Sequence, residues 1–495
     1  MLRILLIEAQ SNWFTKGGPR LLEPDFDIII PPIGLIYIAT YLKDKLKNNI
    51  QVKIIDLVAD FLKSPNLEIG LEDILKEYNP DIVGIRGVNI FSEQFHETTK
   101  IIKELNEDVV VVGGGPYITM DLQGASKDKA IDYFVIGEGE ITFTELVERL
   151  LNNQSVSDVK GLAYRDNGKL IINEPRPFIE DLDCLPFPDY SLISVDKYSR
   201  FLNYGFNRRR QAIILSSRGC PYSCIYCHNM FGRKFRARSA ENIFEEIKIL
   251  YNDFGIKDLY FIDDNFNLDY QRAIELFDLI INNGVKINIY FPNALRGDII
   301  DRYFIDKMVE AGVICLFYAI ETASARLQKF IKKFIDLDKL AENIHYTCEK
   351  GIMVGPIIMV GFPTETEEEA LQTIEYLKQF KKVAMPVFHS VKYHPNTEIY
   401  DLALRNGFKL EDVRLKYRET YYDISYAGTP SIPRSTFISL HLKFQQDILF
   451  SKERLLNAIE IQEKFLTKQE ILDFYSILFR KVITDLELDV LRYVK

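Results

Sequence analysis

The sequence has few cysteines and histidines, and its basic residues are outnumbered by acidic ones. Its 495 residues contain six cysteines and six histidines, and 71 Asp and Glu outnumber 61 Lys and Arg. The formal charge of −10 argues against an extended nucleic-acid interface, because binding to phosphates requires a basic surface. Six cysteines in a chain of this length do not form the disulfide framework of small secreted domains.

Long hydrophobic runs are also missing. No segment reaches the ~18 apolar residues that a membrane-spanning helix needs. Residues 1–7 carry one early positive charge and a short apolar run without a small-residue cleavage site, which predicts a first strand and not a signal peptide. We therefore expect a cytoplasmic protein without a transmembrane segment, which is compatible with peripheral contact with a membrane.

Strand-like and helix-like stretches alternate through the first 150 residues. The expected strands are 3–7, 52–56, 82–86, 109–112 and 133–136. The expected helices between them include 35–47, 92–105 and 141–151. This alternation predicts a parallel, doubly wound (Rossmann-like) sheet, whose ligand site lies beyond the carboxyl ends of its strands.

Several of these strands end in glycine or proline. Glycine lets the backbone approach a bulky ligand and supplies positive φ, although ordinary turns use it for the same reasons. The candidate ligand-binding residues at these ends are Gly34, Gly113, Gly114, Gly115, Gly137 and Glu138.

A second alternating series begins near Gln211 and ends near residue 400. Its expected strands are 212–217, 258–262, 286–291, 314–320, 355–360 and 387–393. The expected helices include 241–252, 270–282 and 366–380. Six βα units predict a partial TIM-like barrel, with its chemistry at the carboxyl ends of the strands.

Composition divides the rest of the chain. Residues 151–205 are irregular and contain several prolines and aspartates, which is typical of an interdomain linker. The last part is charged and mostly helical, for example over 461–479, and we interpret it as a cap. The predicted domains are 1–163, a linker over 164–205, 206–400, and a helical cap region over 401–495.

Three of the six cysteines fall within eight residues. Cys220, Cys224 and Cys227 have the spacing C-x3-C-x2-C and directly follow the first strand of the second series. Their thiols are therefore expected on a loop at the barrel mouth. Thiolates are soft ligands that suit iron–sulfur clusters and zinc. Three of them bind three irons of a cubane and leave the fourth iron open for a chelating substrate.

Two other groups could use the same residues. A structural zinc would take the three thiolates and His228, and residues 224–228 match the C-x-x-C-H pattern of haem attachment. Zinc usually comes in a small autonomous module, whereas this loop opens a series of six βα units. Haem attachment predicts an exported protein, and no signal sequence is evident. Both features favour the iron–sulfur cluster.

The cysteine loop, with Tyr226 before its third cysteine, resembles the radical S-adenosylmethionine (SAM) superfamily. The resemblance implies a [4Fe–4S] cluster that cleaves SAM. Residues at later strand ends resemble the SAM contacts of the family: Asp263 and Asp264 at the amino group, Arg296 at the carboxylate or ribose, Glu321 after the fourth strand and Gly361 near adenine. A zwitterionic, cationic cofactor needs such carboxylates and a guanidinium, although any one of these residues could instead be a surface or salt-bridge residue.

Motifs of the first half occur in the order seen in cobalamin (B12)-dependent radical SAM enzymes, which implies a cobalamin-binding domain. The chain lacks the D-x-H-x-x-G motif that donates a histidine to cobalt in methionine-synthase-like domains, and His96 is the only histidine before His228. We therefore expect no histidine beneath the corrin. Arg86 and Asn89, after the third strand, are candidates for that position, although a plain strand-end loop explains them too.

The resemblance implies formation of a 5′-deoxyadenosyl radical, with an electron donor such as flavodoxin or ferredoxin. The leading reaction is C-methylation of an unactivated carbon of a small or lipid-like substrate. Radical ring closure or C–C bond formation on an isoprenoid lipid or tetrapyrrole is the alternative, and a non-catalytic cobalamin-binding protein is an alternative of another class. A tRNA methylthiolation enzyme is disfavoured, because no cysteine precedes Cys184 and the chain is acidic. Four tyrosines would suit either an apolar substrate pocket or a core: Tyr417, Tyr421, Tyr422 and Tyr426.

Overall fold

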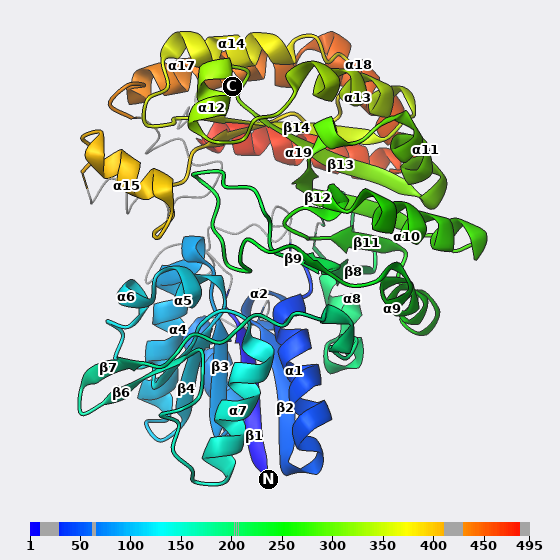
Figure 1. Cartoon of the computed structure of the whole chain (residues 1–495). Helices are drawn as coiled ribbons and strands as arrows, with labels where there is room; N and C mark the ends of the chain where they lie inside the picture. The colour runs from blue at the N-terminus through cyan, green and yellow to red at the C-terminus, as the bar shows by residue number, and fades with distance from the viewer. Residues whose placement is uncertain are drawn as a thin grey trace, which may run out of the picture. The chain divides into compact units, whose positions relative to one another are not determined.

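The computed structural model describes residues 1–9, 29–61, 66–201, 203, 205, 207–409 and 429–485. The chain divides into two compact units (Figure 1). The first unit comprises Met1–Phe201 and Asn229–Gly232, and the second comprises Leu202–His228 and Arg233–Lys495. In the part of the chain that is described, no helix has the length and apolar character needed to cross a membrane.

The first unit is built on a seven-stranded sheet with the order β2-β1-β3-β4-β5-β6-β7. Its strands are β1 (Leu2–Glu8), β2 (Ile50–Asp56), β3 (Ile82–Arg86), β4 (Val110–Gly114), β5 (Tyr133–Val135), β6 (Leu162–Asp166) and β7 (Lys169–Ile172). The first five strands pair in parallel, as expected. The chain runs from β1 outward to both sides, so the topological switch point, where such sheets bind ligands, lies between β1 and β3.

Helices cover both faces of this sheet. They are α1 (Ile33–Leu46), α2 (Leu57–Phe61), α3 (Leu67–Tyr78), α4 (Ser92–Leu105), α5 (Pro116–Met120), α6 (Leu122–Ala125), α7 (Gly139–Leu151) and α8 (Val195–Tyr198). α1 and α7 pack together on one face. A continuous core that includes the fully buried Leu71, Phe95 and Ile118 joins α3, α4 and α5 to the other face. This arrangement confirms the doubly wound fold.

The hairpin of β6 and β7 extends the sheet in antiparallel fashion and lies where the sequence reading expected irregular chain. Its two-residue loop is Asn167–Gly168, and both residues have positive φ (48° and 80°). Asn-Gly is the preferred pair for this type I′ turn, because neither residue is strongly penalised there. The turn signal was therefore present in the sequence, and the expectation of irregular chain from 151 to 205 missed it.

The second unit contains a six-stranded sheet with the order β15-β14-β13-β12-β11-β8. The strands are β8 (Gln211–Ile214), β11 (Asp258–Phe261), β12 (Asn288–Leu295), β13 (Val313–Glu321), β14 (Met353–Val360) and β15 (Val387–Ser390). All neighbours pair in parallel, so all carboxyl ends lie on one edge. The connecting helices are α9 (Ala240–Asp253), α10 (Tyr270–Asn282), α11 (Arg302–Ala311), α12 (Ala325–Phe330), α13 (Leu337–Glu349) and α14 (Glu367–Leu377). β8 and β15 are the two edge strands, which confirms the expected partial (βα)6 barrel.

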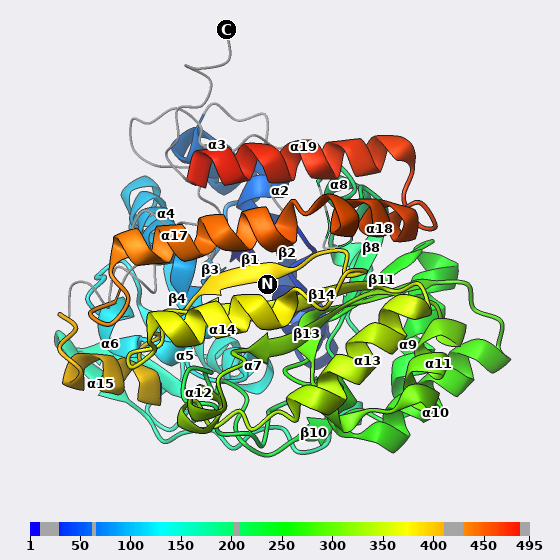
Figure 2. The same cartoon turned by 90° about the horizontal axis from the view of Figure 1, so that it is seen from above.

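The C-terminal region is helical, as expected, with α15 (Glu398–Arg405), α17 (Arg434–Phe444), α18 (Lys452–Gln462) and α19 (Lys468–Asp485). α17 lies alongside α14 (Figure 2). The stretch 461–479, expected to be mostly helical, contains a break between α18 and α19. Thr467 and Glu470 form a reciprocal cap, in which each backbone N–H donates to the other side chain, and this capping box begins a new helix. The four C-terminal tyrosines lie outside the described residues.

Arg454 of α18 fastens this region to the sheet. It is 2% exposed. Its guanidinium donates to the carbonyls of Val383 (3.2 Å) and Ala384 (2.9 Å), which precede β15, and to those of Ile448 (3.0 Å) and Leu449, which precede its own helix. Four carbonyl groups therefore depend on one buried side chain.

Replacing Arg454 with Ala should lower the stability of the second unit by about 2–3 kcal/mol, because buried carbonyls lose their donors. The expected result is a lower urea midpoint for one unfolding transition of the full chain. Lys452→Ala, an exposed change in the same helix, is the control and should shift the midpoint little. Equal midpoints for the two variants would contradict the role of Arg454.

Candidate functional site

The cysteine loop leaves the carboxyl end of β8 and is closed at its base by a short antiparallel pair, β9 (Ser217–Arg218) with β10 (Arg236–Ala237). Its middle is fixed by the backbone of the buried Ile225. The Ile225 N–H donates to the Ile331 carbonyl (3.2 Å), and the Ile399 N–H donates to the Ile225 carbonyl (3.0 Å). The loop is therefore held from two distant segments of the second unit.

All three cysteines of the loop are free thiols. Cys224 is buried, Cys220 is half-buried and Cys227 is exposed. Burial raises the pKa of Cys220, and the nearby Asp264 and Cys224 raise it further. A metal is bound by thiolates, so occupation of this loop releases protons.

His228 follows the third cysteine directly, and its ring packs edge-on against the ring of His394, at 6.4 Å between centroids. Among the described residues, no three His, Cys, Asp or Glu side chains are already gathered around one point. Three thiolates on one loop suit a cubane, because each of three irons takes its own thiolate.

Tyr226 and Glu321 are in contact. Neither the cysteine spacing nor the strand pattern of the sequence predicts this pair. The Tyr226 hydroxyl donates to Glu321 Oε1 (2.9 Å), and Lys333 Nζ donates to the same oxygen (3.1 Å). Burial raises the pKa of Tyr226 well above its usual range, and the Glu321 carboxylate adds to this. Glu321 itself has a φ of +64° at the end of β13. Sequence reasoning missed Lys333.

Asp263 braces the base of the cysteine loop. Its Oδ1 accepts hydrogen bonds from the hydroxyls of Ser216 (2.8 Å) and Ser217 (2.6 Å). Its buried Oδ2 has no hydrogen-bond partner among the described residues. Burial raises the pKa of Asp263, although Arg272 opposes the shift. The two serines were not predicted, because their pairing with Asp263 is set by adjacent parallel strands.

Asp264 faces the same loop. Its Oδ2 accepts from the Gly219 N–H (3.2 Å), and burial raises its pKa while His228 lowers it. The next residue, Asn265, is also buried, and its side-chain oxygen has no partner within the described residues. The chain from 263 to 265 therefore offers two unpartnered acceptors at the carboxyl edge of the sheet.

Arg296 is firmly engaged. Its guanidinium forms a bidentate pair with Asp298 (2.9 and 3.1 Å) and donates to the Phe334 carbonyl (2.8 Å). It also lies 4.2 Å from the ring centroid of Tyr222, in the cysteine loop. The charge predicted from the sequence thus lies beside the loop, held by a carboxylate that the sequence reading did not identify.

Gly361 lies in a turn that requires glycine, because its φ is +105°. The N–H groups of Gly361 (2.5 Å) and Phe362 (3.1 Å) donate to Glu365 Oε2, and the Tyr393 hydroxyl donates to the Gly361 carbonyl (2.5 Å). The other oxygen of Glu365 is buried without a partner in the described structure. Burial raises the pKa of Glu365 to about 8, although the two N–H groups lower it.

In the first unit, an ion pair lies at the switch point of the sheet. Arg86 Nη1 is 2.7 and 2.9 Å from the two carboxylate oxygens of Glu8, the residue opposite it in register. A Cβ on Gly34 would lie 3.6 Å from Arg86 Nε, and one on Gly115 would lie 2.8 Å from Arg86 Cγ. Gly115 therefore makes room for the arginine, whereas the distance at Gly34 is an ordinary van der Waals contact. The buried Asn89, just beyond β3, has an amide nitrogen without a described partner.

The remaining glycines of this edge differ in their surroundings. A Cβ on Gly113 would meet Ile118 and Phe95 at 3.2 Å, so close packing alone explains this glycine. Gly114 and Gly137 have more room, with Val135 at 3.9 Å from the former and nothing within 4 Å of the latter. Gly137 has a φ of +81°. Of these three glycines, Gly114 and Gly137 leave open space at the strand ends.

His96 is fully used inside the first unit. One ring nitrogen lies 2.7 Å from Asp128 Oδ2 and the other 2.8 Å from the Tyr117 hydroxyl. A histidine ligand to a metal needs one ring nitrogen for the metal. That no histidine lies beneath a corrin stays a prediction.

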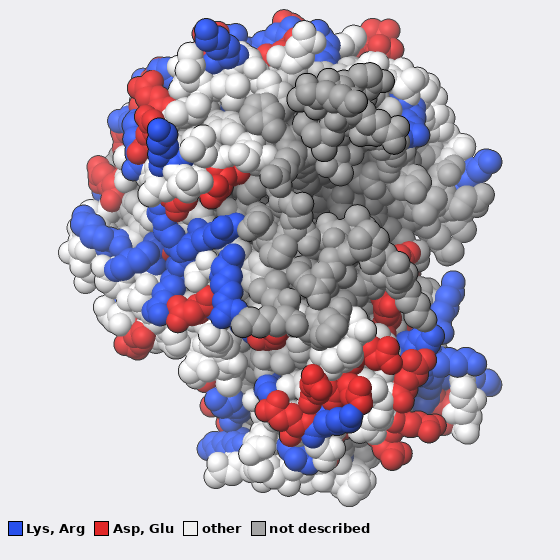
Figure 3. All heavy atoms as spheres, turned by 180° about the vertical axis from the view of Figure 1, so that it is seen from behind, with Lys and Arg blue, Asp and Glu red and all other residues white. Residues whose placement is uncertain are grey.

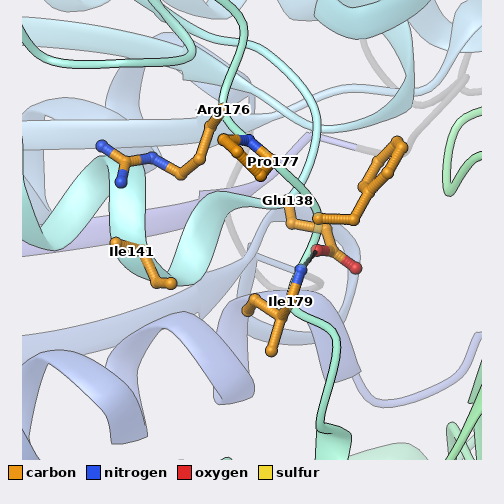
Figure 4. Close-up of a pocket in the computed structure, with 6 residues that line it drawn as sticks. Glu138, Ile141, Arg176, Pro177 and Ile179 are labelled. Atoms are coloured by element: carbon orange, nitrogen blue, oxygen red, sulfur yellow. Dashed lines mark hydrogen bonds between the residues drawn. The ribbon is translucent and has the colours of Figure 1, made fainter.

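Glu138 braces a neighbouring segment. Its Oε2 accepts from the Ile179 N–H (2.7 Å), and it lines a small pocket with Ile141, Arg176 and residues 177–179 (Figure 4). A cofactor role for Glu138 stays a prediction. Among the described residues of the face in Figure 3, acidic and basic side chains are interspersed.

Two family models match the sequence: the Radical SAM superfamily over residues 214–377 and the B12 binding domain over residues 25–147. An uncharacterized methyltransferase of Pyrococcus horikoshii is 33% identical over 384 residues, 77% of this chain and 80% of the relative. The cytidylyl-2-hydroxyethylphosphonate methyltransferase of Streptomyces wedmorensis is 28% identical over 468 residues, 85% of this chain and 84% of the relative.

A more distant relative and a solved structure are also similar to this chain. The anaerobic magnesium-protoporphyrin IX monomethyl ester cyclase of Rubrivivax gelatinosus is 26% identical over 357 residues, 71% of this chain and 62% of the relative. The solved structure of the radical SAM methyltransferase TsrM from Kitasatospora setae, with cobalamin and a [4Fe–4S] cluster bound, has a TM-score of 0.66 and 18% identity. That match covers 81% of this chain and 75% of the other, and the two chains share the fold.

The raised pKa of Glu365 predicts a pH-dependent stability. From its ordinary value of 4.5 up to about 8, the folded state keeps a proton that the unfolded state has lost, so stability falls as pH rises through this window. Glu365→Gln does not titrate and keeps an acceptor for the two N–H groups.

The variant should therefore gain stability relative to the natural chain between about pH 5 and about pH 8.5, measured as the difference in Tm at each pH. Glu367→Gln, an exposed change two residues away, is the matched control and should show no such gain. A constant difference in Tm across the window would refute the raised pKa.

Proposed function

Because the chain belongs to the cobalamin-dependent radical SAM enzymes, which use a [4Fe–4S] cluster, SAM and cobalamin, we propose that it methylates an unactivated carbon of a small or lipid-like substrate. The observation that carries this proposal is the likeness, over at least four-fifths of their length, to two relatives that are named as methyltransferases. We further propose residues 1–163 as the cobalamin-binding domain, whose sheet the β6–β7 hairpin completes, and 206–400 as the radical SAM core, followed by a helical cap.

The cysteine loop fits the cluster. Its three thiols are free, lie on one loop at the carboxyl edge of a parallel sheet, and influence one another electrostatically. The backbone bonds of Ile225 hold the loop independently of a metal. Cys220, Cys224 and Cys227 would therefore bind three irons and leave the fourth to SAM.

The strand-end acceptors fit SAM. The unpartnered oxygens of Asp263 and Asn265 lie at the same edge as the loop, and a buried acceptor without a donor is unfavourable until a ligand supplies one. The SAM ammonium is a donor of the required kind. Asp264, Arg296, Glu321 and Gly361 would complete the site with charge and backbone.

The switch point of the first unit fits cobalamin. Arg86 is held by both carboxylate oxygens of Glu8, and Asn89 offers a donor without a described partner. Gly114 and Gly137 leave space for a bulky ring. We propose that Arg86 borders the lower face of the corrin without ligating cobalt, because a guanidinium stays protonated.

When bound, the cluster and SAM supply a 5′-deoxyadenosyl radical that removes a hydrogen atom, and methylcobalamin supplies the methyl group. The contributions of the protein are positional. Ile225 fixes the middle of the cysteine loop, Tyr226 ties the same part of the loop to Glu321, and Asp263 ties its base to the sheet through two serines. These bonds orient the reacting groups at one edge.

Ring closure or C–C bond formation on an isoprenoid lipid or tetrapyrrole is the second candidate. It is supported by the likeness to a magnesium-protoporphyrin ester cyclase, which is weaker and covers less of the relative. Either reaction needs single electrons, which we propose come from a flavodoxin or ferredoxin. Product mass separates the two reactions, because only methylation adds a methyl group.

Anaerobic reconstitution with iron and sulfide should give about four irons per chain and, after reduction with SAM present, 5′-deoxyadenosine. Cys224→Ala should lose most of the iron and all of the 5′-deoxyadenosine, because a ligand is missing. Cys184→Ala, a free exposed thiol outside the loop, is the control and should keep both. A natural chain that is fully loaded but makes no 5′-deoxyadenosine would overturn the proposal.

The cobalt environment gives a separate test. The electron paramagnetic resonance spectrum of cob(II)alamin bound to the natural chain should show no splitting from a protein nitrogen. His96→Gln should leave this spectrum unchanged, because both His96 nitrogens bind within the protein. Arg86→Gln should change the spectrum, because it frees space beneath the corrin. Nitrogen splitting that disappears in His96→Gln would reject the assignment.

A further inference from the structure

Lys333 is a cation held beside the cysteine loop and is not part of any motif used above. Its side chain is 15% exposed, and its ammonium is 3.1 Å from Glu321 Oε1. The same oxygen accepts from the Tyr226 hydroxyl of the cysteine loop at 2.9 Å. The ammonium is therefore held by a carboxylate that also binds the loop, and a buried ion pair of this kind favours the charged form of both partners. Burial lowers the pKa of Lys333, but Glu321 and the neighbouring cysteines raise it further, which agrees with this geometry.

The backbone directs Lys333 to this place. The residues on either side of it, Lys332 and Phe334, have φ of +56° and +51°. Residues other than glycine seldom adopt this backbone conformation. The Lys332 carbonyl lies 3.8 Å from Cys224 Sγ, and Ile331 accepts the bond from Ile225. The segment 331–334 thus runs along the cysteine loop.

The neighbouring Lys332 behaves differently. Its side chain is 41% exposed and pairs with Glu398 at 2.6 Å. The chain therefore holds two adjacent lysines of equal charge, one buried against the thiols and one at the surface. Only the first is close enough, in a poorly solvated environment, for its charge to act strongly on the loop.

We propose that Lys333 is a positioning residue whose ammonium, held by Glu321, raises the reduction potential of the cluster bound by Cys220, Cys224 and Cys227. The inference rests on the proposed function of these cysteines. In the step concerned, one electron from a flavodoxin- or ferredoxin-class donor converts the cluster from the 2+ to the 1+ state, the donor is oxidised by one electron, and no bond or proton changes. A fixed positive charge stabilises the more negative reduced form.

The test is a redox titration of the reconstituted full chain, without SAM, followed by electron paramagnetic resonance of the reduced cluster. Lys333→Gln and Lys333→Met should lower the ratio of reduced to oxidised cluster at a given potential at least tenfold, which is about 59 mV for one electron. Lys333→Arg should restore the natural midpoint. Lys332→Gln, the same change of charge one residue away, should leave the midpoint unchanged.

The outcomes separate this inference from the proposed function. A natural chain that binds no four-iron cluster rejects the proposed function. A midpoint in Lys333→Gln and Lys333→Met equal to that of Lys332→Gln, with full iron content, rejects only the role of Lys333. Loss of the cluster from both neutral variants also rejects that role, because it would make Lys333 a structural residue.

Discussion

One carboxylate oxygen joins three parts of the radical SAM core. Glu321 Oε1 accepts from Tyr226 of the cysteine loop and from Lys333 of the segment after α12, while the residue itself ends β13. A buried carboxylate is unfavourable unless donors surround it. Two donors on one oxygen meet this requirement and at the same time fix the loop that carries the thiols. The positive φ of Glu321 shows that the strand end is shaped for this contact.

The same requirement explains which strand-end groups are satisfied within the protein and which are not. Glu8 is paired with Arg86, and Glu365 accepts from two backbone N–H groups. Asp263 has one oxygen bound by two serines and one without a described partner. Glu8 thus has both oxygens paired within the protein, whereas Asp263 and Glu365 each keep one oxygen without a described partner. These two carboxylates follow strands β11 and β14, at the edge where parallel sheets bind ligands.

The sequence was sufficient for what depends on local pattern. The eleven expected strands lie within a few residues of observed ones, because apolar runs and strand-end glycines are local signals. The β6–β7 hairpin was missed, although Asn167–Gly168 is a typical sequence for its turn. The break between α18 and α19 was missed as well, although Thr467 and Glu470 have the spacing of a capping box. The partners of the site were beyond reach. Three residues that bind the predicted SAM contacts were not predicted: Lys333, Ser216 and Asp298. They reach those contacts because strands and loops that are distant in sequence meet at one edge of the sheet.

Charge balance at the cysteine loop connects these observations. A cluster on three thiolates is negative, and Asp264 and Glu321 add negative charge nearby. Reduction adds one more unit, which becomes less favourable as negative charge accumulates. Lys333 offsets part of this charge permanently, whereas the sulfonium and ammonium groups of SAM offset it only when SAM is bound. On the role proposed for Lys333, the protein supplies the constant part of this compensation and SAM supplies the rest when it is bound. Reduction of the cluster is then most favourable when SAM is present, which is when the electron is used.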